Sequence, residues 1–300
     1  MVTHEMSLPK ITIVTTNLNQ EVYLESTILS VINQNYPNLE YIIIDGKSTD
    51  HSVDIIKKYE NYLSFWCSER DKGLYDALNK GFRRSTGEIL MWINSDDMLQ
   101  EGSLYNIAEI FNTFQNVNWI TGINISFDER GRVIGADRAK GFTKYDFYTY
   151  NYQWLQQEST AWRRELWEKA GNYLSTDYKF AGDFELWVRF FRHAKLLPCD
   201  ILIGGFRMRS GNQISLNSLD AYEREVKQII EAEKKILSQS ERRNLFMLRT
   251  ITFLKSILMY SIVLDLTIFT RLLNKLERNL KKKSNNRIHI NRINCKFEMI

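Results

Sequence analysis

The first hundred residues alternate between short apolar runs and segments in which apolar residues recur every three or four positions. The runs are rich in β-branched residues and predict four strands, at 10–16, 39–44, 63–67 and 89–93. The periodic segments between them predict helices at 23–34, 52–59 and 74–82. Strands that alternate with helices in this way indicate an α/β fold, with right-handed crossovers and a doubly wound, mostly parallel sheet flanked by helices.

The pattern continues to about residue 215 and then changes. Helices are expected at 101–114 and 165–170 and from Phe180 onward, and further strands at 119–127, 133–136 and 202–208. From Leu219 the pattern is helical, with a charged stretch at 221–237 and a longer apolar one at 244–280. We therefore expect a domain at 1–215, made of halves at 9–100 and 101–215, and a helical, basic C-terminal extension at 216–300.

Acidic side chains follow three of the four predicted strands. Asp45 ends the second strand, Asp71 lies after the third, and Asp96 and Asp97 follow the fourth. Because the carboxyl ends of parallel strands open on one edge of a sheet, these loops are expected to converge there on a ligand. Two adjacent carboxylates after a buried strand suit a divalent cation that carries a diphosphate. Alternatively, they cap the helix predicted near Gly102.

Composition narrows the class of protein. The apolar fraction of 44% and the charged fraction of 25% are typical of a globular protein. The 3 cysteines and 4 histidines are scattered, which predicts no zinc site and no disulfide framework and favours a reducing compartment. No GxGxxG follows the first strand and no GxxxxGK[ST] occurs, which disfavours dinucleotide-cofactor and P-loop folds. The sequence predicts neither a signal peptide nor a spanning helix.

Positive charge is concentrated beyond residue 270. That segment holds 9 Lys or Arg and 2 Glu in a chain of net charge +4, so the body is slightly acidic and no nucleic-acid partner is expected. Apolar helices that end in cations suit an anionic membrane surface, and 245–283 is expected to bind one. The alternatives are a helical hairpin packed on the body or a homodimer contact. The expected location is the cytoplasm, at the inner face of the plasma membrane.

Five segments, in their order along the chain, resemble the family 2 glycosyltransferases of the GT-A fold. They read ITIVTTNLNQ, LEYIIIDGKSTDHS, SERDKGLYDALNKG, NSDD at a strand end, and AGDFELW. The resemblance covers roughly 9–212 and looks most like bacterial enzymes that build polysaccharides and lipid-linked glycans. It implies transfer of a sugar from a nucleotide-diphospho-sugar to an acceptor hydroxyl, with inversion. The half at 9–100 would bind the nucleotide-sugar, and the half at 101–215 the acceptor.

The resemblance also implies roles for individual residues. Base, ribose and the rest of the nucleotide pocket would be held by the ends of the first three strands, through Thr15, Thr16, Asn17, Asp45, Asp71 and Lys72. The DxD-type element would bind ribose or sugar through Asn94 and Asp96, and Mg²⁺ or Mn²⁺ on the diphosphate through Asp96 and Asp97. Asp183 would be the general base that takes the acceptor's proton, a role compatible with capping its own helix.

Three departures from the family's pattern bear on the site. Asn94 stands where the family often has Asp, so the metal element carries one charge less. Leu18 precedes Asn19, where the family often has a Tyr that stacks on the base. Arg209 ends the motif Phe206-Arg207-Met208-Arg209, where related sequences often carry a His, and it either contacts the diphosphate instead or has no role there.

Besides Arg209, two further residues are candidates for the acceptor side. Glu158 either orients the acceptor sugar or forms a surface pair with Arg163 or Arg164. Trp187 either stacks on a sugar ring or lies in the core.

Two other functions remain as alternatives. A sugar nucleotidyltransferase also uses a doubly wound sheet and a metal, but needs a Gly-rich, basic loop after the first strand, and residues 15–20 contain no Gly, Lys or Arg. A non-catalytic nucleotide-sugar binder or membrane scaffold is the other. The presence of Asp45, Asp96, Asp97 and Asp183 together argues against it.

Overall fold

The four strands predicted in the first hundred residues form one end of a mixed sheet, with β3 at its edge. They are β1 (Ile11–Asn17), β2 (Leu39–Asp45), β3 (Phe65–Ser68) and β4 (Ile89–Asn94). All four are parallel, as the sequence predicts, and the structure places them in the order β3-β2-β1-β4. Side chains of β1, β2 and β4 are nearly all buried, which explains why their sequences read as continuous apolar runs. This computed structural model describes residues 8–151, 154–209, 218–260, 267–281, 286–291 and 293–300.

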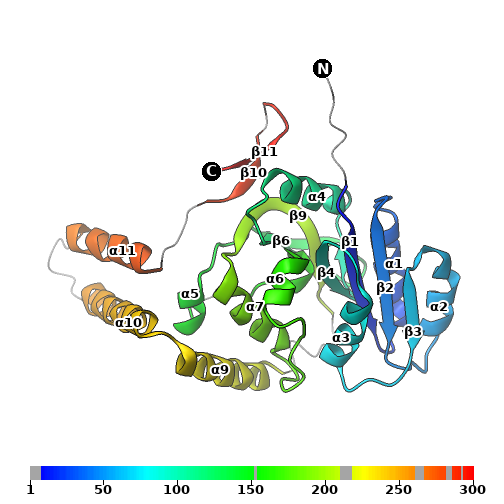
Figure 1. Ribbon diagram of the computed structural model, residues 1–300, viewed down its shortest axis with the longest axis horizontal. Coiled ribbons are helices and arrows are strands. Elements are labelled where there is room, and N and C mark those ends of the chain that lie inside the picture. The colour runs from blue at the N-terminus through cyan, green and yellow to red at the C-terminus, as the bar shows by residue number, and fades with distance from the viewer. Residues whose placement is uncertain (1–7, 152–153, 210–217, 261–266, 282–285, 292) are drawn as a thin grey trace.

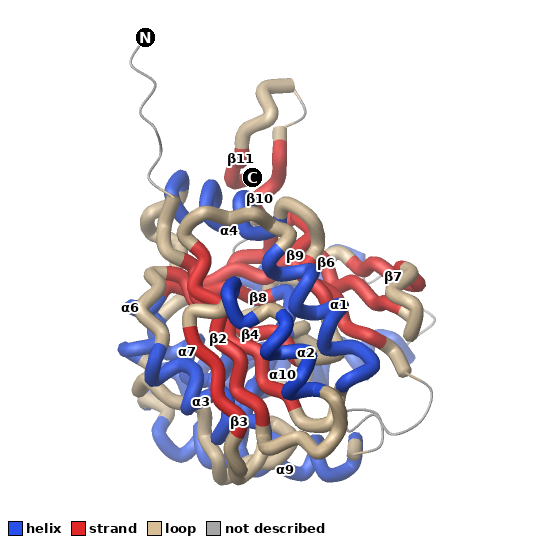
Figure 2. The backbone as a smooth tube through the Cα atoms, turned by 90° about the vertical axis from the view of Figure 1, so that its right-hand side faces the viewer, coloured by secondary structure: helices blue, strands red, loops and turns tan. Residues whose placement is uncertain are grey.

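Helices cover both faces of this parallel part (Figures 1 and 2). They are α1 (Glu21–Ile32), α2 (Ser52–Lys58) and α3 (Leu74–Arg84), with a 3₁₀ turn η1 (Glu60–Tyr62) before β3. The register pairs Asn17 with Asp45 and Asp45 with Ser68, and Thr16 with Asn94. The prediction that the loops after these strands open on one edge of the sheet is therefore confirmed.

The second half continues the sheet beyond β4 with a change of direction. β8 (Thr160–Arg163) lies antiparallel between β4 and β6 (Trp119–Phe127), and β9 (Leu197–Arg207) lies parallel to β6. Short strands β5 (Met98–Leu99) and β7 (Val133–Asp137) pair with β9 and β6. The sequence did not predict β8, because it is only four residues long and a helix follows at once.

The helices of the second half pack around a cluster of aromatic rings. They are α4 (Ser103–Thr113), α5 (Lys144–Tyr148), α6 (Arg164–Lys169) and α7 (Gly182–His193), with a 3₁₀ turn η2 (Gln157–Ser159) before β8. Trp187 of α7 is 1% exposed. Its ring stacks between Trp92, at 5.6 Å between centroids, and Trp119, at 5.7 Å. Trp187 therefore belongs to the core, and the expectation that it stacks on an acceptor sugar does not hold.

The described part of the C-terminal extension consists of three helices followed by two short strands. Its elements are α9 (Leu219–Ile236), α10 (Gln239–Tyr260), α11 (Thr267–Lys281), β10 (Ile288–Ile290) and β11 (Phe297–Met299). The two strands form an antiparallel pair, and β10 lies beside β9 at the edge of the sheet. They were not predicted, because three-residue strands give too short an alternation to detect. The domain boundary expected at 215/216 lies outside the described residues.

Helices α10 and α11 lie side by side (Figure 1) and are tied to each other and to the body. Lys255 of α10 pairs with Glu277 of α11. Lys281 of α11 forms a buried ion pair with Asp146 of α5, 2.6 Å between charged atoms. This is the helical hairpin that the sequence left open as an alternative. Within the described part of the chain, no helix is long and apolar enough to cross a membrane.

Candidate active site

Asp45 is the most completely bonded carboxylate at the ligand edge of the sheet. It is fully buried at the end of β2. One oxygen accepts hydrogen bonds from Asn17 Nδ2 at 2.7 Å and Ser48 Oγ at 2.5 Å. The other accepts from the Ser48 backbone N–H at 2.9 Å and Ser68 Oγ at 2.6 Å. Asp45 thus joins the ends of β1, β2 and β3 into one rigid socket.

The end of β1 supplies a buried acceptor to the same socket. Asn17 uses its amide N–H₂ on Asp45 and Ser48, whereas its Oδ1 is buried and accepts no hydrogen bond from the described residues. A buried acceptor without a donor is costly, so this atom is suited to a ligand N–H or hydroxyl. Thr16 lies beside it, but Thr15 faces the core and its hydroxyl contacts Tyr41 at 3.1 Å.

Asp71 lies next to this socket on the loop after β3. A Cβ atom at Gly46 would be only 2.6 Å from Asp71 Oδ2, so the carboxylate approaches the chain where a side chain would block it. Its other oxygen accepts from the Gly73 backbone N–H at 2.8 Å. Lys72 is exposed beside it. The loops after β2 and β3 therefore meet as the sequence predicts, and what they bind stays a prediction.

The turn after β4 is held by a buried arginine of β9. Arg207 donates its backbone N–H to Asp97 Oδ1 at 2.9 Å and its Nε–H to the Asp96 carbonyl at 2.6 Å. Asn94 Nδ2 donates to Asp97 Oδ2 at 3.2 Å. Asp97 is fully buried, and Asn94 Oδ1 is buried without a hydrogen-bond donor among the described residues. Asp97 therefore braces the turn from inside, and Asp96 stands nearer the surface.

Arg209 brings a positive charge to Asp96. Its Nη2 lies 2.8 Å from Asp96 Oδ2, and its Nη1 donates to Gln20 Oε1 at 3.0 Å. Its guanidinium also lies 5.4 Å from the centre of the Tyr23 ring. Gln20 and Tyr23 follow β1, whereas Arg209 follows β9. The contacts of Arg209 therefore connect the segments after these two strands beside Asp96.

Three carboxylates on this side of the sheet, Asp96, Asp97 and Glu158, have raised pKa values. Burial raises the pKa of Asp97 well above its usual range, and the nearby charges of Asp96 and Glu158 add to the effect. Burial also raises the pKa of Asp96, which Arg209 opposes. Burial raises the pKa of Glu158 to about 8, with further contributions from Asp96 and Asp183. Glu158 therefore interacts electrostatically with Asp96 of the turn after β4 and with Asp183 of α7.

The carboxylates of Asp96 and Asp97 fit a metal ion only if a bound ligand supplies the other coordinating atoms. Excess buried negative charge favours a bound cation, and carboxylate oxygens suit Mg²⁺ or Mn²⁺. However, no three His, Cys, Asp or Glu side chains come together as a metal-binding group in the described ranges. Asp96 and Asp97 alone supply too few ligands, so a diphosphate and water would have to provide the remainder.

Asp183 is the second residue of α7 and is held in place from two sides. Its Oδ1 accepts the Phe184 backbone N–H at 2.8 Å and lies 3.4 Å from the Tyr75 hydroxyl of α3. A Cβ atom at Gly182 would be 2.6 Å from the Tyr75 ring, so only glycine allows this approach. Burial raises the pKa of Asp183 to about 6. A carboxylate of this pKa is ionised at neutral pH and basic enough to accept a proton.

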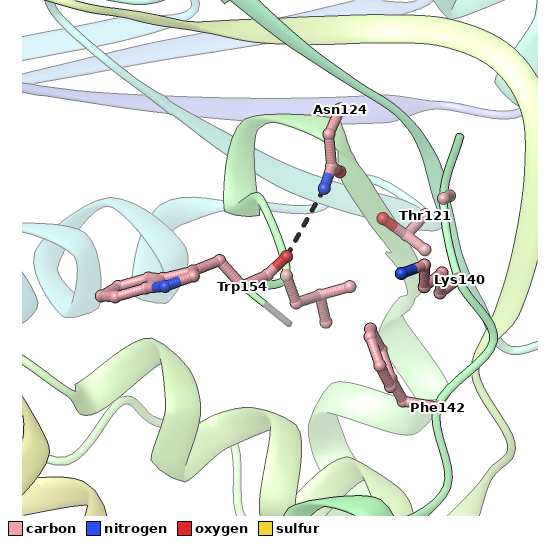
Figure 3. Close-up of a pocket in the computed structure, with 7 residues that line it drawn as sticks. Thr121, Asn124, Lys140, Phe142 and Trp154 are labelled. Carbon is pink, nitrogen blue, oxygen red and sulfur yellow. Dashed lines mark hydrogen bonds between the residues drawn. The ribbon is translucent and has the colours of Figure 1, made fainter. Parts of the chain in front are cut away.

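The remaining candidates for the acceptor side differ in where they lie. Glu158 is buried, and its Oε1 has no hydrogen-bond partner among the described residues. It does not form the surface ion pair that was the alternative. A small pocket lies nearby, lined by Thr121, Asn124, Ala139, Lys140, Phe142, Trp154 and Leu155. Figure 3 shows the Trp154 ring turned away from Thr121 and Lys140, and none of the predicted site residues lines this pocket.

Sequence reasoning missed three residues that shape the site. Arg207 was read only as part of a motif, although its burial organises the Asp96–Asp97 turn. Tyr75 was counted as a helix residue, and no local signal showed that it reaches α7 across a hundred positions. Glu225 lies in the extension and contacts the backbone before α7. Only a comparison of long-range contacts reveals such residues.

Comparison with known proteins adds family relationships to this geometry. The model of the family described as "Glycosyl transferase family 2" matches residues 12–171. An uncharacterized glycosyltransferase of Mycobacterium tuberculosis is 28% identical over 187 residues, which cover 61% of this chain and 69% of the relative. The putative teichuronic acid biosynthesis glycosyltransferase TuaG of Bacillus subtilis is 32% identical over 99 residues, 32% of this chain and 39% of TuaG.

Among solved structures, S. aureus TarS 1-349 in complex with UDP-GlcNAc has a TM-score of 0.63 at 19% identity. That match covers 90% of this chain and 79% of TarS 1-349. The complex of the same TarS fragment with UDP gives a TM-score of 0.60 at 16% identity, over 97% of this chain and 96% of that one. At this level of identity the likeness shows the fold, and the predicted GT-A fold is confirmed.

Proposed function

Because this chain belongs to glycosyl transferase family 2 and is a glycosyltransferase of the bacterial glycan-building type, we propose that it transfers a sugar from a UDP-sugar to an acceptor hydroxyl with inversion. The observation that supports the proposal is the buried Glu158, whose Oε1 has no hydrogen-bond partner among the described residues. The charges of Asp96, at the DxD-type turn, and of Asp183, at the start of α7, both contribute to its raised pKa. In this proposal the carboxylate for the donor and the carboxylate for the acceptor would face one site.

The donor's nucleoside would occupy the socket at the ends of β1, β2 and β3. The unpartnered Asn17 Oδ1 suits the ring N–H of a uracil base or a ribose hydroxyl. Asp45 and Asp71 would hold the ribose and base from the other two strand ends. TarS was solved with UDP and UDP-GlcNAc, which makes uridine the nucleoside that we propose.

The diphosphate would lie over Asp96 and Arg209. Arg209 supplies a fixed guanidinium, which suits phosphate oxygens, and Asn94 Oδ1 is a free acceptor for a sugar or ribose hydroxyl. Asp96, backed by Asp97, would hold Mg²⁺ or Mn²⁺ together with the diphosphate. When bound, the metal would offset the negative charge that develops on the departing diphosphate.

Asp183 would act as the general base. It accepts the proton of the acceptor hydroxyl while that oxygen bonds to the anomeric carbon and the bond to the diphosphate oxygen breaks on the opposite side. Its pKa of about 6 leaves it ionised at neutral pH. Glu158, with a pKa of about 8, is mostly protonated at pH 7 and would donate a hydrogen bond to the acceptor sugar.

The acceptor proposed here is a cell-surface polysaccharide or a lipid-linked glycan at the cytoplasmic face of the membrane. TuaG is named for teichuronic acid biosynthesis, and GgaB of Bacillus subtilis for minor teichoic acid biosynthesis. We propose that residues 101–215 form the acceptor half and residues 9–100 the donor half, with the extension after residue 215.

The hairpin of α10 and α11 would bind an anionic membrane surface. Phe246, Phe253 and Ile257 lie on one side of α10 and are 72%, 64% and 50% exposed. Arg243 and Arg249 are exposed on the same helix, and its only acid, Glu241, pairs with Lys144 of α5. Apolar side chains flanked by cations without competing acids suit anionic lipid.

Vesicle binding tests this surface. Wild-type protein should co-sediment with phosphatidylglycerol vesicles and not with phosphatidylcholine vesicles. The double substitution Phe246→Ser and Phe253→Ser should abolish binding, whereas Val133→Ser with Ile134→Ser, an equally exposed apolar pair on β7, should not. Equal binding by both double variants would rule the surface out and favour a homodimer contact or simple packing.

Donor hydrolysis tests the transferase proposal itself. Purified protein is incubated with UDP-, GDP- and dTDP-sugars in the presence of Mn²⁺, Mg²⁺ or EDTA, with calorimetric titration of the free nucleotides in parallel. Slow, metal-dependent release of UDP from one donor is expected. Binding of a nucleotide without any turnover in the presence of glycan acceptors would favour a non-catalytic binder, and absence of binding would refute the proposal.

A further inference from the structure

A carboxylate of the C-terminal extension holds the backbone that leads into α7. Glu225, on α9, accepts a hydrogen bond from the Lys179 backbone N–H at 2.9 Å with one oxygen. Its other oxygen accepts from the Phe180 and Ala181 backbone N–H groups, each at 2.8 Å. Three consecutive amides on one carboxylate make a strong, directional attachment, because each bond is assisted by the negative charge.

This attachment holds the residues that lead into α7. Ala181 is the N-cap residue and has no side chain able to accept from the first turn. Glu225 instead fixes Ala181 and the two residues before it, so it sets where the first turn begins. Asp183 lies two residues beyond Ala181, so the position of its carboxylate depends on how this turn is held.

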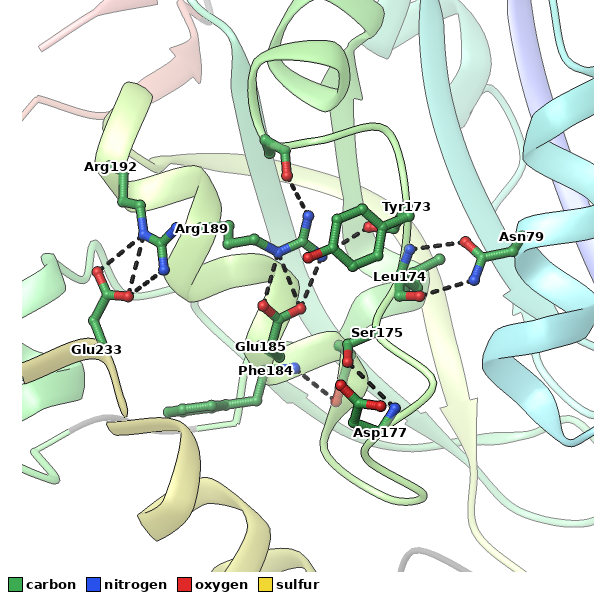
Figure 4. A network of polar contacts seen from close by, with 12 residues as sticks. Asn79, Tyr173, Leu174, Ser175, Asp177, Phe184, Glu185, Arg189, Arg192 and Glu233 are labelled. Atoms are coloured by element: carbon green, nitrogen blue, oxygen red, sulfur yellow. Dashed lines mark hydrogen bonds and ion pairs between the residues drawn. The ribbon is translucent and has the colours of Figure 1, made fainter. Parts of the chain in front are cut away.

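Helix α9 is also fixed at the far end of α7. Arg192, near the end of α7, donates to Glu233 of α9, with Nε to Oε1 at 3.0 Å (Figure 4). Glu233 is buried and also accepts from the Tyr148 hydroxyl of α5 at 3.0 Å. The two attachments, eight residues apart on α9, hold α7 at both ends. Helix α9 therefore cannot move along α7 without breaking one of them.

We propose that α9 of the extension is part of the catalytic centre, and that Glu225 is a positioning residue that fixes the first turn of α7 and thereby the Asp183 carboxylate. The inference rests on the proposed function, since it assigns Asp183 the role of base. It gives the extension a task in the transfer reaction that is separate from any contact with a membrane.

The groups around Asp183 determine what a change at Glu225 does to it. Three acidic groups from three elements face Asp183: the Tyr75 phenol of α3, Glu158 of η2 and Glu225 of α9. The negative charge of Glu225 contributes to the raised pKa of Asp183, after the larger effect of burial. Neutralising Glu225, or letting water reach a loosened turn, lowers the pKa of Asp183 in either case.

The experiment compares Glu225→Gln and Glu225→Ala with Glu223→Gln, a substitution at an exposed position of the same helix. Transfer rate is measured from pH 5 to 9 at saturating donor, together with donor affinity and thermal unfolding. Glu225→Ala should lower kcat by about 10- to 100-fold with donor affinity unchanged, since a misplaced catalytic group costs about that much. In Glu225→Gln the fall of the transfer rate on the acidic side of the pH profile (its acidic limb) should also move to lower pH. Glu223→Gln should match wild type.

The outcomes separate this inference from the proposed function. If wild-type protein transfers sugar and Glu225→Gln retains both its kcat and its acidic limb, the positioning role is refuted and the transferase stands. If kcat falls only in proportion to lost folded protein, with the acidic limb unmoved, Glu225 is merely structural and the inference fails. If wild-type protein transfers no sugar, the proposed function itself fails.

Discussion

Two groups of buried carboxylates lie on the same edge of the sheet and differ in what surrounds them. Asp45 receives four hydrogen bonds from neutral donors on three strand ends, all within 2.9 Å. Burial raises the pKa values of Asp96, Asp97 and Glu158, and the charge of Asp96 adds to the effect on the other two. Burial is common to both groups, so the supply of donors makes the difference. The first group, around Asp45, has all its hydrogen bonds supplied by the protein. The second group, Asp96, Asp97 and Glu158, is suited to bind a cation or a proton.

The largest expected effect comes from removing the base on the far side of the second group. Asp183→Asn keeps the size of the side chain and its bond from the Phe184 backbone N–H, but cannot take a proton. Turnover should fall by about 10²–10⁴-fold, the usual contribution of general base catalysis, while nucleotide affinity stays at the wild-type value. Turnover and calorimetry on one preparation check this. An unchanged rate would reduce Asp183 to a helix cap.

A smaller effect, and one that sharpens the contrast, should come from Asp96→Asn compared with Asp45→Asn. Asp96→Asn should weaken donor binding by about 10- to 100-fold in Mn²⁺ and remove the effect of EDTA, because a neutral amide is a poor metal ligand. Asp45→Asn should weaken binding equally with Mn²⁺ and with EDTA, because it damages a socket that uses no metal. Donor affinity measured with Mn²⁺ and with EDTA tests this. If both variants responded to metal in the same way, Asp96 and Asp45 would not differ in metal binding.

The smallest expected effect is on stability. The pKa of Glu158 is about 8 in the folded chain and about 4.3 when unfolded, so between these values folding binds a proton and the unfolding free energy falls as pH rises. Glu158→Gln should therefore increase the unfolding free energy clearly at pH 8 and by little at pH 4. Chemical denaturation at both values tests this, with the exposed Glu101→Gln as the control. If Glu158→Gln increased the unfolding free energy equally at both pH values, the pKa of Glu158 would not be raised in the folded protein.

The first group could be anticipated from the sequence, and the second only in part. Asp45 and Asp71 follow continuous apolar strands, and the parallel register brings such loops together by geometry alone. The burial of Asp97 behind Asp96 depends on Arg207, more than a hundred positions away in the chain. Likewise, nothing near Trp187 in the sequence reveals that two other indoles sandwich it. Local pattern predicts elements and strand ends, whereas depth and pairing come from contacts across the chain.

The C-terminal segment shows the same limit. Its helices were predicted from periodicity, but their attachment rests on buried apolar residues such as Ile230 and Leu248, and on ion pairs with α5 and α7 such as Lys281 with Asp146. The return of β10 to the edge of β9 rests on the pairing of Ile288 with Cys199, which no local signal indicates. From its charge, this segment was predicted only as a basic helical extension, although its strands β10 and β11 add to the sheet.

The most direct single measurement is the pH dependence of transfer by the wild-type protein at saturating donor and metal. If Asp183 is the base, with the pKa of about 6 that its burial produces, the rate should be half-maximal near pH 6 and fall tenfold for each further unit of acid. Asp183→Asn should lack this limb. A wild-type rate that stays constant down to pH 4.5 would contradict the assignment, because an ordinary exposed carboxylate, or no base at all, would then govern the reaction.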